Sequence, residues 1–427
     1  MTPFEVFASI TTLAALFSWI NHRWVHLPQT IGLLAITMVS SLAIVILHAT
    51  GVFVGDPLVP LIRNLDFHDT LLNGMLGAML FAGALHLQVD DLLEQKWAIL
   101  LLATGSVVLS TLIVGGGSWL VFRMFGLGVP FLYCLLFGAL ISPTDPIAVS
   151  AILRGAGVPH SLYVKITGES LFNDGVGVVV FLVIFGIATT GAEATAGHVL
   201  YLFAEEVFGG LLYGAIVGYV AYRLLKSVDQ YKVEILITLA LVTGGYALAQ
   251  RIHVSGPLAM VVAGLMVGNQ GRALAMSPRT RERLDSFWEL ADDFLNAVLF
   301  VLIGVEVVVL EFAPAFIVAG LVLIPLILLA RWTSVSIPIT ILRALRRPVS
   351  PHAIKLLTWS GLRGGISVAL ALSLPAGGHH DLIVLVTYVV VAFSILVQGL
   401  TVDPLARRLS RPRTVEPAVA AGGRNAS

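Results

Sequence analysis

Long apolar stretches follow one another along this chain of 427 residues, and each has about the length of a membrane-spanning helix. Such a helix needs roughly 20 mostly apolar residues. Hydrophobic residues make up 57% of the chain and charged residues 12%, too few charges to cover the surface of a soluble protein of this length. The sequence therefore predicts an all-α polytopic membrane protein, since lipid requires every backbone polar group to be paired internally.

The apolar stretches predict about 13 transmembrane helices. The expected spans cover residues 3–20, 29–50, 69–88, 97–122, 130–153, 161–188, 199–222, 231–250, 254–270, 287–310, 315–341, 352–374 and 381–402. They would form a single transmembrane domain over residues 1–402. Residues 403–427 are rich in Arg, Pro, Gly and Ala and are expected to form a short cytoplasmic tail.

The distribution of Lys and Arg tests this count and orients the chain. With the N-terminus outside, twenty of the 25 basic residues fall on the inner side of the membrane. Only Arg63, Arg123 and Arg251 fall on the outer side, and Arg331 and Arg363 lie within spans. Because basic residues concentrate on the cytoplasmic side of membrane proteins, we expect a multi-pass protein of the cell membrane with an outer N-terminus and a cytoplasmic C-terminus.

The span at 130–153 is interrupted by Ser142-Pro143-Thr144-Asp145-Pro146. A proline has no backbone N–H, so the carbonyl of Ser142, four residues before Pro146, loses its helical partner. In lipid such a carbonyl must find protein, water or a cation. A carboxylate and a hydroxyl at the break suit a small hard cation; the alternative is a kinked helix capped by Asp145.

The span at 161–188 carries a polar face. Glu169 and Asn173 are four residues apart and share one face of a helix, and Ser170 and Asp174 share the adjacent face. Ionisable side chains at membrane depth are costly and are functional by default. The alternative, a polar loop at the membrane surface, would leave only residues 176–188 in the bilayer, too few to span it.

Three glycines surround Arg363 in the span at 352–374, and glycines so close together weaken a helix. A buried Arg363 requires a counter-charge, for which Glu169 and Asp174 are the candidates. The alternative is an Arg side chain that extends to the membrane interface.

The two broken spans are the fifth and the twelfth. They correspond if spans 1–6 and 8–13 are repeats, and because the offset of seven is odd, the repeats would be inverted. Interrupted helices at matching positions of two halves indicate the site of a transporter. This interpretation rests on the spacing of the spans alone.

Further acidic residues lie near the ends of the seventh and tenth spans. They are Glu205, Glu206, Glu289, Asp292 and Asp293. These side chains are either interfacial or functional, and Arg331, inside the eleventh span, could pair with one of them.

The composition and the motifs exclude several functions. Basic and acidic residues balance at 25 each, and no basic domain indicates nucleic-acid binding. Cys134 is the only cysteine, and the 11 histidines show no metal-binding spacing. No nucleotide-binding loop, zinc-protease motif or serine-hydrolase motif is found. We therefore expect no cofactor and no enzyme activity, and transport would be driven by an ion gradient.

Three motifs and their order closely resemble the monovalent cation–proton antiporters, in the sodium/proton exchanger branch of bacterial and archaeal type. They are Thr144-Asp145-Pro146, Gly168-Glu169-Ser170-Leu171-Phe172-Asn173-Asp174-Gly175 and Gly361-Leu362-Arg363-Gly364-Gly365. The resemblance covers the third to the thirteenth span. It implies a homodimer in which a dimerisation bundle packs against a core bundle, with the fifth and twelfth helices unwound and crossed.

Carried over position by position, the resemblance assigns the family's ion-binding aspartate to Asp174, which would hold Na⁺. The implied further ligands are Asp145, Thr144, Ser170 and Asn173. Glu169 and Arg363 would form a structural ion pair. One departure is Ala82, where many relatives carry Glu, although that position is not a ligand in the family.

The implied function is exchange of Na⁺, with Li⁺ as a further substrate, for H⁺ by alternating access, with competition at Asp174, in pH homeostasis. Asn173 stands where electrogenic relatives carry a second Asp, which resembles the electroneutral, one-for-one exchangers. Three alternatives remain open. The chain could exchange K⁺ or several monovalent cations for H⁺, form a cation channel, or use Glu169 and Asp174 as acid and base of a membrane-embedded enzyme.

Overall fold

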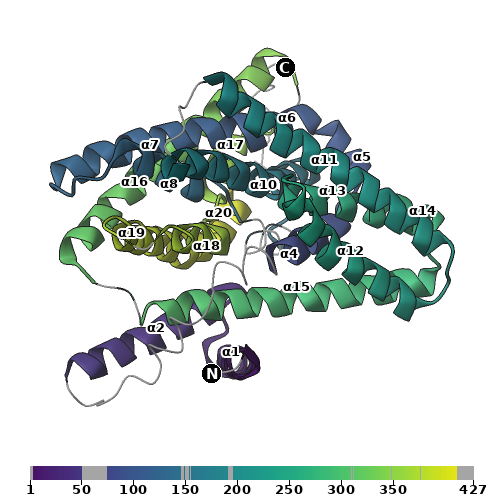
Figure 1. Cartoon of the computed structure of the whole chain (residues 1–427), viewed down its shortest axis with the longest axis horizontal. Helices are drawn as coiled ribbons and strands as arrows, with labels where there is room; N and C mark the ends of the chain where they lie inside the picture. The colour runs from purple at the N-terminus through teal and green to yellow at the C-terminus, as the bar shows by residue number, and fades with distance from the viewer. Residues whose placement is uncertain are drawn as a thin grey trace, which may run out of the picture.

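The computed structural model of the chain describes residues 3–50, 75–145, 149, 153, 155–190, 196–308, 310, 312–347, 349–375 and 377–410. Within these residues every regular element is a helix (Figure 1). The α-helices are α1 (Pro3–Ile20), α2 (Gln29–Ala49), α4 (Leu76–Leu85), α5 (Val89–Glu94), α6 (Lys96–Leu100), α7 (Ser106–Met124), α8 (Phe131–Ile141), α10 (His160–Thr190), α11 (Ala196–Lys226), α12 (Tyr231–Arg251), α13 (Gly256–Met266), α14 (Arg272–Leu274), α15 (Pro278–Glu306), α16 (Pro314–Ala344), α17 (Ala353–Trp359), α18 (Gly365–Leu372), α19 (His380–Phe393) and α20 (Gly399–Ser410). Short π-helical turns adjoin some of them: η1 (Asn21–Val25), η3 (Leu101–Gly105), η4 (Val267–Gly271) and η5 (Ser394–Gln398).

Each expected span contains helix, as the hydropathy pattern predicts. Eight helical stretches of the described chain are long and apolar enough to cross a membrane. The apolar helices α4 and α8 are shorter, at 10 and 11 residues. Residues 69–74 of the third span lie outside the described residues, and the fifth span is broken after Ile141. The all-helical membrane fold is therefore confirmed, whereas the count of 13 spans and the inverted repeat stay predictions.

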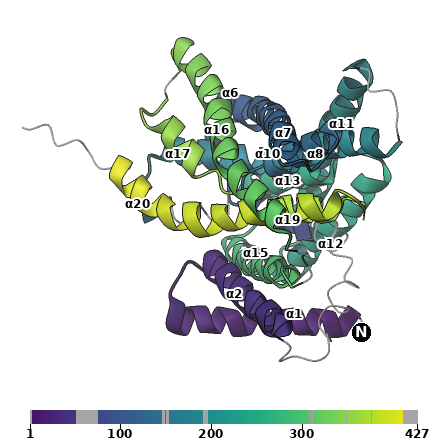
Figure 2. The same ribbon diagram turned by 90° about the vertical axis from the view of Figure 1, so that its left-hand side faces the viewer.

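The long helix α15 divides the molecule. In both views α1 and α2 lie on one side of α15, and α10, α13 and α16 lie on the other (Figures 1 and 2). α15 packs directly against α1, α2, α4 and α12, and it also contacts α18. One edge of α15 thus faces the bundle that contains the polar face of α10.

Both predicted helix interruptions are confirmed. Helix α8 ends at Ile141, and the chain has no regular helix from Ser142 to Asp145. Helix α17 ends at Trp359 and α18 begins at Gly365, so residues 360–364 form the second interruption. Prolines cause the first break and glycines the second, because proline removes a helical donor and glycine weakens the helix.

The two interruptions touch each other and pack on α10. The backbone N–H of Asp145 donates to the carbonyl of Leu362 at 2.8 Å. Gly177 of α10 permits the approach of the first break, because a side chain there would collide with the ring of Pro143. Gly364 likewise leaves room for the carboxylate of Asp145. The breaks are therefore held together, while their crossing stays a prediction.

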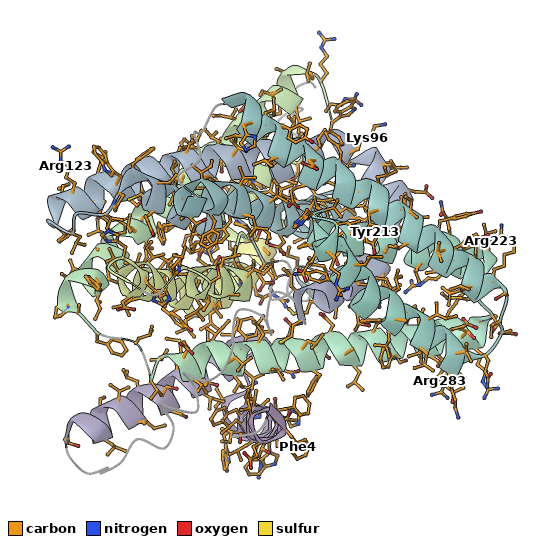
Figure 3. All side chains as sticks on the ribbon, viewed as in Figure 1. Phe4, Lys96, Arg123, Tyr213, Arg223 and Arg283 are labelled. Atoms are coloured by element: carbon orange, nitrogen blue, oxygen red, sulfur yellow. The ribbon has the colours of Figure 1, made fainter. Side chains whose placement is uncertain are left out.

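Basic residues mark opposite ends of the molecule. Figure 3 places Arg123, near the end of α7, at the left, and Arg223 and Arg283 at the right. Lys96, where the same stretch of helix begins, lies toward the right. The sequence assigns Arg123 to one side of the membrane and the other three to the opposite side, and the arrangement in space separates them in the same way.

The C-terminal helix extends past the predicted membrane domain. α20 runs from Gly399 to Ser410, so the predicted boundary at residue 402 falls inside a helix. Its last turn carries Arg407, whose Nε donates to Asp403 at 2.8 Å. Residues 411–427, the rest of the predicted tail, lie outside the described residues.

Candidate functional site

A cluster of polar side chains joins α10 to the break after α8. The hydroxyl oxygens of Thr144 and Ser170 lie 3.0 Å apart. The Asn173 amide bonds Thr144 twice: its oxygen accepts from the Thr144 backbone N–H at 3.2 Å, and its nitrogen donates to Thr144 Oγ1 at 2.9 Å. All three side chains are buried. The structure thus brings together three residues that the sequence predicts for one site.

Asp174 and Asp145 line one cavity beside this cluster. Its other lining residues include Pro143, Leu171, Leu299, Gly364 and Ser367. The cavity measures about 40 Å³, which is room for more than one water-sized group. Asp174 is 3% exposed, whereas Asp145 is partly exposed. The two carboxylates are close enough to repel each other, so a bound cation or proton would relieve an unfavourable interaction.

Glu169 forms an ion pair with Arg331. The predicted ion pair between Glu169 and Arg363 is therefore wrong. Arg331 Nη1 and Nη2 donate to Glu169 Oε1 and Oε2 at 2.6 and 2.8 Å. Both side chains are buried. Arg331 also donates to the carbonyl of Leu357, in the last turn of α17, at 3.2 and 3.3 Å. The pair therefore ties α10 and α16 to the end of α17.

The side chain of Arg363, in the second break, donates to backbone carbonyls of the first break. Its Nη1 donates to the carbonyl of Ser142 and, at 2.9 Å, to the carbonyl of Pro143. Its own backbone N–H donates to Ser394 Oγ at 2.8 Å. The carbonyl of Ser142 is the one that Pro146 deprives of a helical donor, so the expectation that it finds another partner is confirmed. Arg363 thus bonds backbone carbonyls, whereas Glu169 pairs with Arg331.

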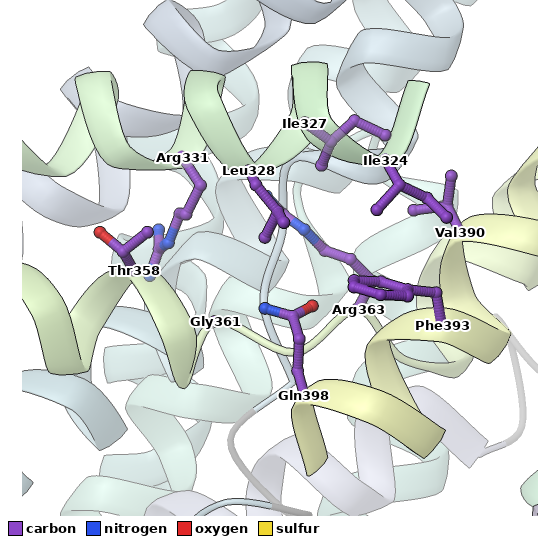
Figure 4. A pocket seen from close by; sticks show the side chains of 10 residues that line it. All are labelled: Ile324, Ile327, Leu328, Arg331, Thr358, Gly361, Arg363, Val390, Phe393 and Gln398. Atoms are coloured by element: carbon purple, nitrogen blue, oxygen red, sulfur yellow. The ribbon is translucent and has the colours of Figure 1, made fainter. Parts of the chain in front are cut away.

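The two arginines also face a second, smaller cavity between α16, α17 and α19 (Figure 4). Thr358, Gln398 and apolar side chains of α16 and α19 line the rest. Its volume is about 10 Å³, room for about one water. This cavity lies on the arginine side of the breaks, whereas the aspartates line the other cavity.

The sequence does not identify Arg331 as the partner of Glu169. The position of Arg331 within a span does indicate that it needs an acidic partner. The sequence instead suggests that Arg331 pairs with one of the acidic residues near the span ends. Of these, Glu205 and Glu206 lie on α11, and Asp292 lies on α15, close enough to Asp145 to interact with it electrostatically. Asp174, by contrast, forms no ion pair with any Lys or Arg in the part of the chain that the structure describes.

The chemistry of the site is that of hard oxygen donors. Two carboxylates, two hydroxyls and an amide gather beside the two helix breaks. Among the described residues no three His, Cys, Asp or Glu side chains cluster as a metal-binding group. Such a set can hold a proton or a small monovalent cation.

Comparison with known proteins points in the same direction. The family model described as sodium/hydrogen exchanger, transmembrane, matches residues 11–408. The Na⁺/H⁺ antiporter NhaP of Pseudomonas aeruginosa is 48% identical over 416 residues, which are 96% of this chain and 98% of that protein. The Na⁺/H⁺ antiporter NhaH of Halobacillus dabanensis is 33% identical over 372 residues, 84% of this chain and 90% of its own length.

A solved structure shares the fold. The sodium proton antiporter MjNhaP1 from Methanocaldococcus jannaschii at pH 8 superposes with a TM-score of 0.73 and covers 96% of this chain and all of its own. Its sequence is 18% identical, so the likeness concerns the arrangement of helices.

Proposed function

The chain belongs to the sodium/hydrogen exchanger family, and on that premise we propose that it exchanges Na⁺ for H⁺ across the cell membrane. One observation carries the proposal. Asp174 is a buried carboxylate that lines a cavity, lies near two other carboxylates and forms no ion pair with a described Lys or Arg. Such a group gains from binding either a proton or a cation.

We propose that the two ions compete for Asp174. A proton on the carboxylate removes the charge that would bind Na⁺, and a bound Na⁺ occupies the oxygen that would take the proton. Asp145, Thr144 and Ser170 would supply further oxygen ligands, because they adjoin the same cavity or cluster. Li⁺ would fit the same oxygens. Competition couples the two fluxes without a further switch.

Alternating access is proposed because the site would be costly to move through the membrane without a bound ion. Moving a bare carboxylate through the hydrocarbon region costs several kcal/mol or more. The site would therefore change sides only when H⁺ or Na⁺ neutralises Asp174. The two breaks and α10 would move as one unit, since backbone and side-chain hydrogen bonds join them.

Asn173 supports one-for-one, electroneutral exchange. Its amide oxygen accepts from Thr144, and its nitrogen donates to Thr144 and to Glu169 Oε1 at 3.2 Å, so this position adds no second titrating carboxylate. One Na⁺ would then replace one H⁺. In proteoliposomes with a fixed Na⁺ gradient, an imposed membrane voltage should leave the exchange rate unchanged; a steep dependence on voltage would refute this stoichiometry.

The decisive experiment is Asp174→Asn in proteoliposomes. This change keeps the shape of the side chain and removes its charge, so we expect proton movement after a Na⁺ pulse to fall to the level of empty vesicles. Asp403→Asn, on the exposed face of α20, is the control and should retain the wild-type rate. Full exchange by Asp174→Asn would refute the proposal.

The identity of the ion and the transport mode need separate tests. Oxygen ligands alone do not select Na⁺ over K⁺, so separate pulses of Li⁺, Na⁺ and K⁺ should be compared. A response to K⁺ as large as that to Na⁺ would favour the K⁺/H⁺ or mixed-cation alternative.

A channel would pass the cation without moving protons. An exchanger must let either gradient drive the other ion.

We further propose an outer N-terminus, a cytoplasmic C-terminus and a homodimer. The orientation is supported by the concentration of basic residues at one end, where Arg223 and Arg283 lie opposite Arg123 (Figure 3). Cross-linking in native membranes should trap a species of twice the monomer mass, whereas a monomer alone would contradict the dimer.

A further inference from the structure

Helix α15 carries two polar residues, Asp292 and Asn296, on the same face as Leu299, which lines the Asp174 cavity; this face is called the stripe below. Asp292, Asn296 and Leu299 are spaced four and three residues apart, so they lie on one face of the helix. Leu299 lines the cavity, and a side chain at Gly365 would lie 2.5 Å from it. Asp292 therefore lies about 10 Å from the cavity wall along the helix axis, two turns before Leu299.

Two oxygen atoms on this stripe are buried without a donor. Asn296 is 3% exposed, and its nitrogen donates to the backbone carbonyl of Asp292 at 2.8 Å, which fixes the amide beside Asp292. Within the described residues nothing donates to Asn296 Oδ1 or to Asp292 Oδ1. Buried oxygens without a partner are costly, so these two positions call for a donor or a cation.

The acidic groups around the stripe become more buried toward Asp174. Glu289, one turn before Asp292, is exposed; Asp292 and Asp145 are partly exposed; Asp174 is buried. Asp292 is close enough to Asp145 for the two carboxylates to repel each other. Successive carboxylates attract a cation and lower the barrier to its approach.

We propose that Asp292 and Asn296 form a staging site for a monovalent cation, from which the cation passes to Asp145 and Asp174. The proposal rests on the cation exchange proposed above. The two unpartnered oxygens supply protein ligands, and water supplies the remainder. Because α15 begins near Arg283, which lies at the right-hand end in Figure 3, the staging site serves the cavity from the Arg283 end.

The test is a one-sided change in apparent affinity. Asp292→Asn is reconstituted, and exchange is measured with Na⁺ added at the Arg283 end or at the opposite end, using vesicles of defined orientation. We expect the half-saturating Na⁺ concentration at the Arg283 end to rise roughly three- to tenfold, as for loss of one partly screened charge, and the value at the other end to stay unchanged.

Three further variants sharpen the test. Glu282→Gln removes an exposed carboxylate near the start of the same helix, ten residues before Asp292, and should keep both wild-type values. Asp292→Glu keeps the charge and should restore most of the affinity. Asn296→Ala removes an oxygen ligand without changing the charge and should give the same one-sided rise.

Two outcomes would overturn the staging site. The first is a wild-type half-saturation at the Arg283 end in both Asp292→Asn and Asn296→Ala. The second is an equal rise at both ends, which would assign the effect to the shared Asp174 site. If the wild-type protein exchanges no monovalent cation at all, the proposed function is at fault, and that result is distinct from either of these.

Discussion

The guanidinium of Arg363 donates to the backbone carbonyl of Ser142, which would accept from residue 146 in a continuous helix. Residue 146 is a proline, so the side chain from one break replaces the donor missing from the other. The reverse link is the backbone bond from Asp145 to Leu362. The two breaks therefore stabilise each other. Glu169 pairs with Arg331.

Replacing Arg363 should weaken both structure and transport. In Arg363→Ala the carbonyls of Ser142 and Pro143 lose a charged donor in a buried position, at about 1–3 kcal/mol for each orphaned group. We expect a lower unfolding temperature in detergent and little exchange. Arg363→Lys keeps a charged donor and should recover part of both. An Arg363→Ala protein that matches the wild type in stability and rate would contradict this role.

Replacing Arg331 should cost more stability than replacing any exposed arginine. Arg331→Ala leaves the carboxylate of Glu169 buried without its bidentate partner, which costs about 3–5 kcal/mol. Thermal unfolding in detergent should show a large fall in the midpoint. Arg343→Ala is the matched control on the same helix, since Arg343 is exposed and, among the described residues, donates only to backbone carbonyls.

A double variant tests whether Glu169 and Arg331 stabilise the protein through their interaction with each other. In Arg331→Gln with Glu169→Gln, neither member of the pair keeps a charge without its partner, so the loss should be smaller than the sum of the two single losses. Additive losses would show that the two residues do not stabilise each other.

The sequence predicts the helices and both breaks because their causes are local. A helix that faces lipid needs a long apolar run, and proline or glycine interrupts a helix wherever it stands in the chain. The polar face of α10 is equally local, since Glu169 and Asn173 are one turn apart and the amide of Asn173 does reach Glu169, at 3.2 Å.

The pairing of Glu169 cannot be read from the sequence because it depends on the packing of distant segments. Arg331 is 162 residues from Glu169 along the chain, and two arginines compete for several acids. In the structure Arg331 bonds Glu169, whereas the carbonyls of Ser142 and Pro143 accept from Arg363. Only the three-dimensional arrangement shows that these acceptors lie beside it.

Protons should compete with Na⁺ at Asp174. At lower pH on the side of Na⁺ addition, a larger share of Asp174 carries a proton, so the half-saturating Na⁺ concentration should rise, approaching tenfold per pH unit where the protonated form dominates. Rates at saturating Na⁺ should change much less. The measurement is proton movement in vesicles at several Na⁺ concentrations and pH values. A half-saturation independent of pH would contradict a shared carboxylate.

The orientation can be checked with single cysteines because Cys134 is the only cysteine and is buried. In a Cys134→Ala background, Arg123→Cys and Arg223→Cys place a thiol at exposed positions at opposite ends of the molecule (Figure 3). An impermeant maleimide applied to intact cells should label Arg123→Cys and leave Arg223→Cys unlabelled until the membrane is opened. Each variant must retain exchange. The opposite labelling pattern would invert the proposed topology, and with it the side from which the α15 stripe leads to Asp174.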